Sequence, residues 1–393
     1  TYVFDENGDV YDSTGVSILP YEWHREDDDV YGLQVGDFVK KIDGRSFFGC
    51  TNLRGDLYIN MDSGVAPDFS IIEYAAFKNC SGFDGSLIIE DGLQKIGYGA
   101  FKESTLKGNL IFPDSIIEFQ GEAFDGCSNF KGILKLPDSE LTINKFAFRG
   151  CNGLKGDLTI PDGLSGGVRE GTFKDCSGFD GNLYLGTGIE ILEKNAFFNC
   201  SNLKGNLTMP PNLTGIRGSV FYNCNELDGV LTLNSGLKYI GTSAFAQCHQ
   251  ISNGLVITDS VNGIDDYAFN SCRNIQSLTI GTGLNYIGTR AFEGCDSLAG
   301  DIDFKNVTAI RTRAFNETNI GGVSFDEIIY IDSGAFKDCV AINGDIILPD
   351  SLIDLAPESF MGCSNLDGDL VIGDGLTQLR HSVFKDTSFN GGL

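Results

Sequence analysis

The sequence predicts a repeat solenoid that is mainly β, and three observations predict it. A Phe-x-x-Cys motif recurs along nearly the whole chain, with 21–25 residues between successive phenylalanines after a first step of 30. Each repeat also contains a short segment in which apolar and polar residues alternate. The chain holds 51 glycines and only 9 prolines, which suits many tight turns. Repetition at a fixed period of this size indicates stacked units that share one continuous core.

The Phe-x-x-Cys motif contains every cysteine of the chain. Three further copies keep the phenylalanine but carry Ser104, Thr318 or Thr387 in place of the cysteine, and the turn after each is one residue shorter. Fifteen repeats are therefore expected, twelve with a thiol and three with a hydroxyl. The cysteines of this column are Cys50, Cys80, Cys127, Cys151, Cys176, Cys200, Cys224, Cys248, Cys272, Cys295, Cys339 and Cys363.

Each repeat is expected to contribute two short strands. In the segment Gly-x-Leu-x-Ile, alternation with a period of two predicts a strand with one buried face, so that Leu158 and Ile160 point inward and Thr159 points outward. A tight turn follows, written Pro-Asp-Gly at Pro161. A second apolar piece, such as residues 284–287 before Ala-Phe, fits a strand or a short helical turn, and we expect a strand. Because no repeat buries its own apolar face, stacking in register must supply the core.

Two motifs resemble the BspA-type, or Treponema-type, leucine-rich repeat of bacterial and protist surface proteins. They are Leu-x-x-Ile-Gly-x-x-Ala-Phe-x-x-Cys at residues 284–295 and Leu-x-Ile-Pro at residues 158–161. The resemblance implies about 15 stacked leucine-rich repeats with a parallel β-sheet face across residues 47–393. It also implies an extracellular or cell-surface protein without enzymatic activity, associated with adhesion to host matrix, to other cells or to its own kind. A Leu-x-Gly insertion before the strand, as at residues 203–205, departs from the usual pattern.

Residues 1–46 are expected to form an N-terminal cap over the first repeat. Asn7-Gly8 lies between two apolar pairs and predicts a hairpin turn, and the region holds the only tryptophan, Trp23. At the other end, the last repeat stops at Leu393 where the next strand would form. We expect either that more chain follows or that this edge meets a second molecule, which would allow end-to-end association through the C-terminal repeat.

The cysteines are interpreted as packing residues of the solenoid. In-register neighbours would hold their Cβ atoms about 4.8 Å apart and parallel, whereas a disulfide needs about 3.8 Å and converging bonds. No Cys-x-x-Cys spacing suggests zinc, and only His24, His249 and His381 could assist. A column of equivalent thiols also singles out no nucleophile. Free thiols at a tight inner corner are therefore expected.

The outward column of the first strand is the candidate binding face. Threonine, tyrosine and β-branched residues also favour strands for steric reasons, so an ordinary exposed sheet is the alternative. In this column the candidate residues are Tyr58, Thr159, Tyr184, Thr208, Thr232 and Thr279. The column before it is rich in Asp and Asn, for example Asp345 and Asp369, but lacks the dense acidic repeat of calcium-binding β-rolls, so no metal and no cofactor is predicted.

Net charge sets further limits on partners. The formal charge of −26 creates a negative potential that disfavours nucleic acid and anionic lipid surfaces. No run of apolar residues is long enough for a membrane span, and the start at Thr1 is consistent with a processed, secreted chain. Six Asn-x-Ser/Thr sequons would permit N-glycosylation in a eukaryotic secretory pathway. These sequons begin at Asn79, Asn199, Asn206, Asn212, Asn306 and Asn316.

The predicted fold and surface together indicate a class of function. No phosphate loop, nucleophile elbow or His/carboxylate pair is present, so an enzyme is not expected. The leading hypothesis is an extracellular or cell-surface scaffold for adhesion, or a structural subunit that stacks head-to-tail into a filament. The alternative is a recognition module that binds a protein or glycan along its exposed strand face.

Overall fold

The computed structural model describes residues 3–4, 10–11, 17–18, 30–36, 39–61 and 70–389. Strands and turns make up this part of the chain, and none of its residues is helical. The structure divides into two compact units. Unit 1 comprises residues 1–189 and 196–203, and unit 2 comprises residues 190–195 and 204–393. Within each unit the chain winds as a parallel β-solenoid, and we call one turn of it a coil.

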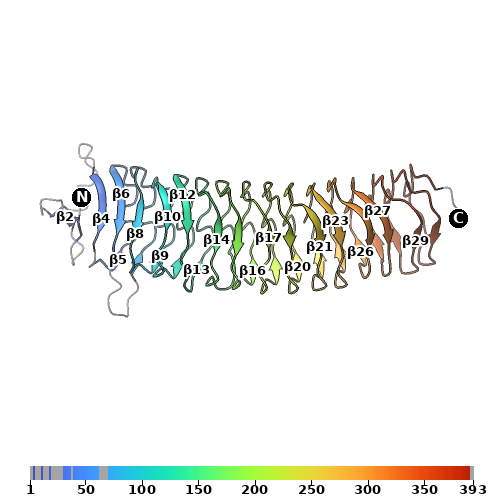
Figure 1. Ribbon diagram of the computed structural model, residues 1–393, viewed down its shortest axis with the longest axis horizontal. Helices are drawn as coiled ribbons and strands as arrows, with labels where there is room; N and C mark the ends of the chain where they lie inside the picture. The colour runs from blue at the N-terminus through green and yellow to red at the C-terminus, as the bar shows by residue number, and fades with distance from the viewer. Residues whose placement is uncertain are drawn as a thin grey trace. The chain divides into compact units, whose positions relative to one another are not determined.

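The coils of unit 1 contribute strands to two parallel ladders, seven strands to ladder A and five to ladder B. Figure 1 shows the two rows, with β6, β8 and β10 in one and β5 and β9 in the other. Ladder A of unit 1 consists of β4 (Val30–Val35), β6 (Leu53–Ile59), β8 (Leu87–Ile89), β10 (Gly108–Ile111), β12 (Phe130–Lys135), β14 (Leu158–Ile160) and β15 (Leu183–Leu185). Ladder B of unit 1 consists of β5 (Lys41–Ile42), β7 (Ile71–Ile72), β9 (Lys95–Ile96), β11 (Glu118–Phe119) and β13 (Thr142–Ile143).

Unit 2 repeats this plan, and its ladder B is one continuous sheet of eight strands. The second apolar piece of the repeat is thus a strand, as expected. Ladder A of unit 2 consists of β17 (Leu207–Thr208), β19 (Leu231–Thr232), β21 (Asn253–Val256), β23 (Ile275–Thr279), β25 (Ala299–Asp303), β27 (Asn319–Ser324), β29 (Ile346–Leu348) and β31 (Leu370–Ile372). Ladder B of unit 2 consists of β16 (Ile191–Leu192), β18 (Gly215–Ile216), β20 (Tyr239–Ile240), β22 (Gly263–Ile264), β24 (Tyr286–Ile287), β26 (Ala309–Ile310), β28 (Tyr330–Ile331) and β30 (Asp354–Leu355).

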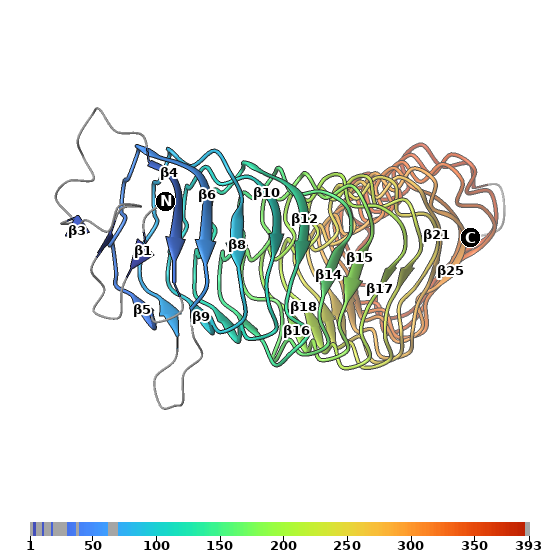
Figure 2. The same ribbon diagram turned by 60° about the vertical axis from the view of Figure 1, so that its left-hand side comes forward.

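Residues 1–46, expected to form a cap, contain strands of two kinds. The strands β1 (Val3–Phe4), β2 (Val10–Tyr11) and β3 (Ser17–Ile18) pair antiparallel, with Val3 opposite Tyr11. The predicted turn at Asn7-Gly8 and Trp23 lie outside the described residues. By contrast, β4 and β5 pair in parallel with β6 and β7, so both ladders begin before Phe47 (Figure 2). The boundary at residue 46 therefore stays a prediction, whereas parallel pairing reaches back to Val30.

A column of stacked phenylalanine rings fills the core of each unit. In unit 1 the rings stack from Phe47 to Phe197 with centroids 4.9–5.6 Å apart. In unit 2 they stack from Phe221 to Phe384 with centroids 5.0–5.7 Å apart. The spacing of the rings matches the spacing of the strands, which is about 4.8 Å in a parallel sheet, so backbone pairing and ring stacking reinforce each other.

Two residues per coil adopt a left-handed backbone at the Phe-x-x-Cys segment. In the coil of Cys295 they are Arg290, with φ of 54°, and Gly294, with φ of 71°. The amides of Arg290 and Phe292 donate to Thr312 and Ala314 of the next coil at 2.9 and 2.8 Å. Amides between them donate within their own coil, so every amide of the segment is satisfied. A non-glycine residue in this region costs roughly 1–2 kcal/mol, which these hydrogen bonds offset.

We expect Phe245→Ala to destabilise unit 2 by about 3–5 kcal/mol, because it removes a fully buried ring from the middle of the column and leaves a cavity. Urea denaturation followed by circular dichroism measures the change as a lower midpoint. Tyr184→Ala is the matched control, since that ring is 51% exposed, and its midpoint should stay close to wild type. Equal midpoints for the two variants would contradict the role of the column.

Candidate functional site

Ladder A presents its outward column to solvent, as the alternation predicted. Thr159 and Tyr184 are direct neighbours on β14 and β15 of unit 1. In unit 2, Thr208 and Thr232 are neighbours on β17 and β19. All four side chains are exposed. Such in-register rows give each unit a regular surface whose side chains are held in place by the ladder beneath.

The remaining two candidates of this column have different neighbours. On β23, Thr279 is exposed and pairs with Val256 of β21, which is 54% exposed. The Tyr58 side chain of β6 is half-buried, because its hydroxyl donates to Glu90 at 2.8 Å and its ring lies beside Ile88. These contacts tie Tyr58 to the unit 1 surface at the start of its ladder.

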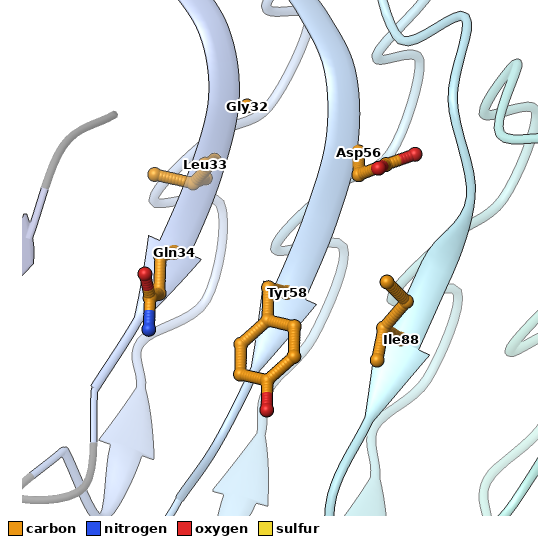
Figure 3. A pocket seen from close by; sticks show the side chains of 6 residues that line it. All are labelled: Gly32, Leu33, Gln34, Asp56, Tyr58 and Ile88. Atoms are coloured by element: carbon orange, nitrogen blue, oxygen red, sulfur yellow. The ribbon is translucent and has the colours of Figure 1, made fainter.

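A shallow pocket surrounds Tyr58 on ladder A of unit 1. Figure 3 shows Gln34, Tyr58 and Ile88 side by side on three neighbouring strands. The pocket is lined by these residues together with Gly32, Leu33 and Asp56. It combines an aromatic ring, an aliphatic side chain and two polar groups, which suits recognition of an amphipathic group on a partner.

Side chains of the Asp/Asn column join successive coils. The Oδ1 atoms of Asp157 and Asp345 accept the backbone amides of Asn182 and Asp369 at 2.7 and 2.8 Å. The amide oxygen of Asn206 accepts the Val230 amide in the same way, at 2.9 Å. An uncharged oxygen thus serves as well as a carboxylate. Among the described residues, no group of three or more His, Cys, Asp or Glu side chains could hold a metal ion.

A second set of aspartates bonds in the opposite direction along the stack. The Oδ1 atoms of Asp84 and Asp180 accept the amides of Gly55 and Gly156 in the preceding coils at 2.7 and 2.9 Å. These aspartates occupy the middle of the Leu/Phe-x-Gly insertion that distinguishes this repeat. Where its middle residue is aspartate, the insertion therefore adds an acceptor, and these carboxylates have a structural use.

Hydrogen bonds from the backbone lower the pKa of Asp84 and of two further aspartates, Asp162 and Asp259, which lie in the turns after ladder A strands. The Gly55 amide lowers the pKa of Asp84, and the Thr187 amide and hydroxyl lower the pKa of Asp162. The Thr282 amide and hydroxyl have the same effect on Asp259. Because each pKa is depressed in the folded chain, the stability it contributes is present above the unfolded value of about 3.9 and is lost as pH falls through the folded pKa.

We expect the triple variant Asp84→Asn/Asp162→Asn/Asp259→Asn to lose less stability than wild type between about pH 5 and pH 2.5. Asparagine keeps the accepting oxygen, as Asn206 shows, but does not titrate. The measurement is the thermal unfolding midpoint as a function of pH. Identical slopes for the two proteins over this range would contradict the assignment.

Every cysteine is buried and free of disulfide bonds. Along the column, the Sγ atom donates to the phenylalanine carbonyl of the preceding coil, for example from Cys248 to Phe221 at 3.0 Å and from Cys272 to Phe245 at 3.1 Å. The same carbonyl accepts the cysteine amide of its own coil, as Phe245 does from Cys248 at 3.1 Å. The thiol thus supplies a second donor to a buried carbonyl at the inner corner.

Two of the three repeats without cysteine keep a donor but aim it differently, whereas the Ser104 hydroxyl lies 3.6 Å from the Cys127 thiol of the next coil. Hydroxyls of Thr318 and Thr387 donate to Phe315 and Phe384 of their own coils, both at 2.8 Å. Neither reaches back to the preceding coil in this bond. The shorter turn that follows these residues in sequence accompanies this change of bonding. The side chain at this position is therefore part of the turn geometry.

Burial makes the thiols in the interior of the column poor nucleophiles, whereas a hydrogen bond with Cys80 lowers the pKa of Cys50 at its start. Burial raises the pKa of the thiols of Cys127, Cys248 and Cys339 to about 12. The attacking species in thiol chemistry is the thiolate, which is scarce at neutral pH under these conditions. The column is thus suited to packing and hydrogen bonding.

We expect the thiols of the native protein to react with Ellman's reagent at pH 8 at least roughly a hundredfold more slowly than those of the chain in guanidinium. Absorbance of the released thiolate measures the rate. The control is Thr232→Cys, which adds one exposed cysteine and should add one fast equivalent without changing the slow class. Rapid native labelling of the whole set would contradict burial of the column.

The sequons differ in accessibility. Asn206, Asn212 and Asn306 are exposed. Asn79 and Asn199 are half-buried, and Asn316 is 5% exposed. A glycan at Asn316 would require its buried side chain to move out into solvent. The fold therefore favours Asn206, Asn212 and Asn306 as sites of modification.

Sequence reasoning missed a row of tyrosines on ladder B of unit 2. Tyr239, Tyr286 and Tyr330 open β20, β24 and β28, and the strands between them open with a small residue. The sequence signal is Tyr-Ile in every second repeat, which is lost when repeats are aligned to one common template. Tyr286 and Tyr330 are 37% and 39% exposed.

These features define a parallel β-solenoid of leucine-rich repeats. Six copies of the model for the BspA type leucine rich repeat region match the chain, and the chain belongs to this family. The matches cover residues 32–133, 58–180, 133–252, 168–299, 229–343 and 329–391. Among curated proteins, none matches this chain. The described residues include no helix that is long and apolar enough to cross a membrane.

Several solved structures are similar to this chain. A leucine-rich repeat protein from Bacteroides ovatus is 23% identical, with a TM-score of 0.65 over 97% of this chain and 88% of that chain, which supports the fold. A leucine rich cell surface protein from Faecalibacterium prausnitzii is 19% identical, with a TM-score of 0.45 over 96% of this chain and 93% of that chain. The pneumococcal vaccine antigen PcpA is 17% identical, with a TM-score of 0.42 over 95% and 83% of the two chains.

Proposed function

We propose that this protein is a non-enzymatic scaffold, extracellular or at the cell surface, that acts in adhesion through ladder A. The observation that carries the proposal is the outward column of ladder A, where exposed aromatic and β-branched side chains stand in register on a rigid core. In unit 1, Ile88, Ile111 and Tyr184 are 37%, 45% and 51% exposed. In unit 2, Val256 and Ile347 are 54% and 60% exposed. Apolar side chains gathered on an otherwise polar surface mark interaction sites.

The partner is a protein or a glycan held by contacts along several coils. Recognition spread over a row of equivalent positions gains strength from many modest contacts, and flat sheet faces of repeat proteins serve this purpose. Membership of the leucine-rich repeat family is consistent with a binding role. The acidic surface supports a partner that is neutral or basic.

End-to-end association through the C-terminal repeat is a second proposal, supported by the apolar surface of that repeat. Val371 and Ile372 of β31 are 51% and 37% exposed, and Leu379 is 51% exposed. Within the described residues, β31 pairs with β29 on one of its two edges. A strand with exposed apolar side chains and an available edge is a template for a second chain.

We expect Tyr184→Asp and Thr208→Asp, tested singly, each to reduce retention of labelled protein on coated wells by roughly tenfold, because a buried carboxylate at the contact costs about 1.4 kcal/mol or more. The wells carry purified matrix glycoprotein or neutral polysaccharide. The matched controls are Asn152→Asp and Ser235→Asp, which add the same charge at exposed positions off ladder A and should bind as wild type.

Sedimentation velocity on the same proteins separates the two proposals. Adhesion through ladder A predicts that the variants lose retention while their concentration-dependent assembly is unchanged. Loss of assembly in the ladder variants would favour self-association through this face. Retention equal to wild type in both variants would refute a role for ladder A in adhesion.

A further inference from the structure

Ladder B of unit 2 carries a regular alternation of tyrosines and small residues. Its eight strands pair in parallel and in register, so the first residue of each strand falls in one outward column. Neighbouring positions in this column are directly paired across the sheet. Read along the stack, the column begins at Ile191, ends at Asp354, and alternates between them as Gly215, Tyr239, Gly263, Tyr286, Ala309 and Tyr330.

The rings of Tyr239 and Tyr286 lie across the glycines of the preceding coils. A Cβ atom on Gly263 would stand 2.3 Å from Cε1 and 2.4 Å from Cζ of Tyr286. A Cβ atom on Gly215 would stand 2.5 Å from the same two atoms of Tyr239. Real Cβ atoms do not approach so closely, so the glycines make room for the rings. Each ring therefore covers the width of two strands.

The rings are both fixed and exposed. The hydroxyl of Tyr286 donates to Asp265 at 2.5 Å, and burial together with this carboxylate raises the pKa of Tyr286 to about 12. Tyr286 and Tyr330 nonetheless keep 37% and 39% of their surface exposed. Successive rings are two strands apart, which is about 10 Å along the stack at a strand spacing of about 4.8 Å. The row forms an aromatic platform, and its central ring, Tyr286, is preorganised because it lies over Gly263 and is held by its hydrogen bond to Asp265.

Polar groups flank the platform without a surplus of positive charge. On one side Lys238, Asn262 and Asn285 are exposed. On the other side Arg311 pairs with Asp332 at 3.5 Å, so its charge is balanced locally. In a chain with a net charge of −26, this surface does not complement a polyanion. It offers amide donors and acceptors beside aromatic rings, which suits a neutral, hydroxyl-rich ligand.

We propose that the row of Tyr239, Tyr286 and Tyr330 binds an extended, neutral β-1,4-linked glycan that runs along the stack of unit 2. The C–H face of a pyranose packs on an aromatic ring, and its hydroxyls bond to amides such as those of Asn262 and Asn285. In a β-1,4-linked chain alternate sugars are turned over, so that the same sugar face recurs once per disaccharide. That repeat is close to the interval between the rings. This inference goes beyond the proposed function, because it uses ladder B and needs no partner on ladder A.

The test is isothermal titration of the full chain with three neutral β-1,4-linked hexasaccharides, namely cellohexaose, mannohexaose and chitohexaose. We expect at least one to bind, and its affinity to rise by roughly tenfold or more from disaccharide to hexasaccharide, because the longer chain reaches more than one ring. Maltohexaose is the linkage control, since its α-1,4 links curl the chain away from a straight row. Equal affinity for maltohexaose would overturn the match of spacing.

Two variants of the central ring make the test specific. Tyr286→Ala is expected to weaken binding by roughly tenfold, which corresponds to about 1.4 kcal/mol. Tyr286→Phe keeps the ring and loses only the hydroxyl, so its affinity should stay within about threefold of wild type. Thermal unfolding followed by circular dichroism verifies that both variants are folded.

Several outcomes would overturn the proposal. One is the absence of binding to all three oligosaccharides at millimolar concentration by a folded wild-type chain. Another is unchanged binding in the triple variant Tyr239→Ala/Tyr286→Ala/Tyr330→Ala. If that variant instead abolishes self-association seen by sedimentation velocity while no sugar binds, the row is an interface between copies of the chain. Retained cellohexaose binding by Tyr184→Asp would separate this site from ladder A.

Discussion

The whole structure depends on parallel backbone pairing between equivalent positions of successive coils. Because each coil lies one strand spacing from the next, all the side-chain columns repeat at about that distance. The phenylalanine rings stack at 4.9–5.7 Å because the backbone holds them there. The backbone carbonyl of a buried phenylalanine such as Phe245 accepts two hydrogen bonds. The cysteine amide of the same coil donates one, and the cysteine thiol of the next coil donates the other. Burial raises the pKa of thiols such as Cys248, and it thereby lowers their reactivity.

Charge in this protein has a structural origin. Asp157 and Asp345 accept amides from the following coil, whereas Asp84 and Asp180 accept amides from the preceding coil. Both sets of aspartates are exposed, so they avoid the full cost of burying a charge. Their oxygens satisfy backbone amides in or beside the strands of ladder A. These aspartates contribute to the acidic surface of the chain. A negative potential disfavours contact with anionic molecules.

The two ladders offer surfaces of different character. Ladder A exposes a varied column of threonines, tyrosines and β-branched residues, a composition that also suits a well-formed sheet. Ladder B of unit 2 is more specific, because Gly215 and Gly263 are needed only where a ring lies over them. A regular sheet would gain from a β-branched residue at those positions. The glycines at both positions indicate that the placement of the Tyr239 and Tyr286 rings matters more there than strand propensity.

The sequence by itself determined the repeat, its fifteen units, the parallel strands and the buried thiols, because periodic apolar columns leave stacking in register as the way to bury them. It also located the outward positions of ladder A, since alternation with a period of two fixes the face. Only the tertiary structure decided what each polar column contacts. The partners of Asp157 and of the thiol of Cys248 lie in neighbouring coils, 25 and 27 residues away. The tyrosine row likewise emerged only when the coils were stacked, because its period is two repeats and the rings of Tyr239 and Tyr286 lie over glycines of the preceding coils.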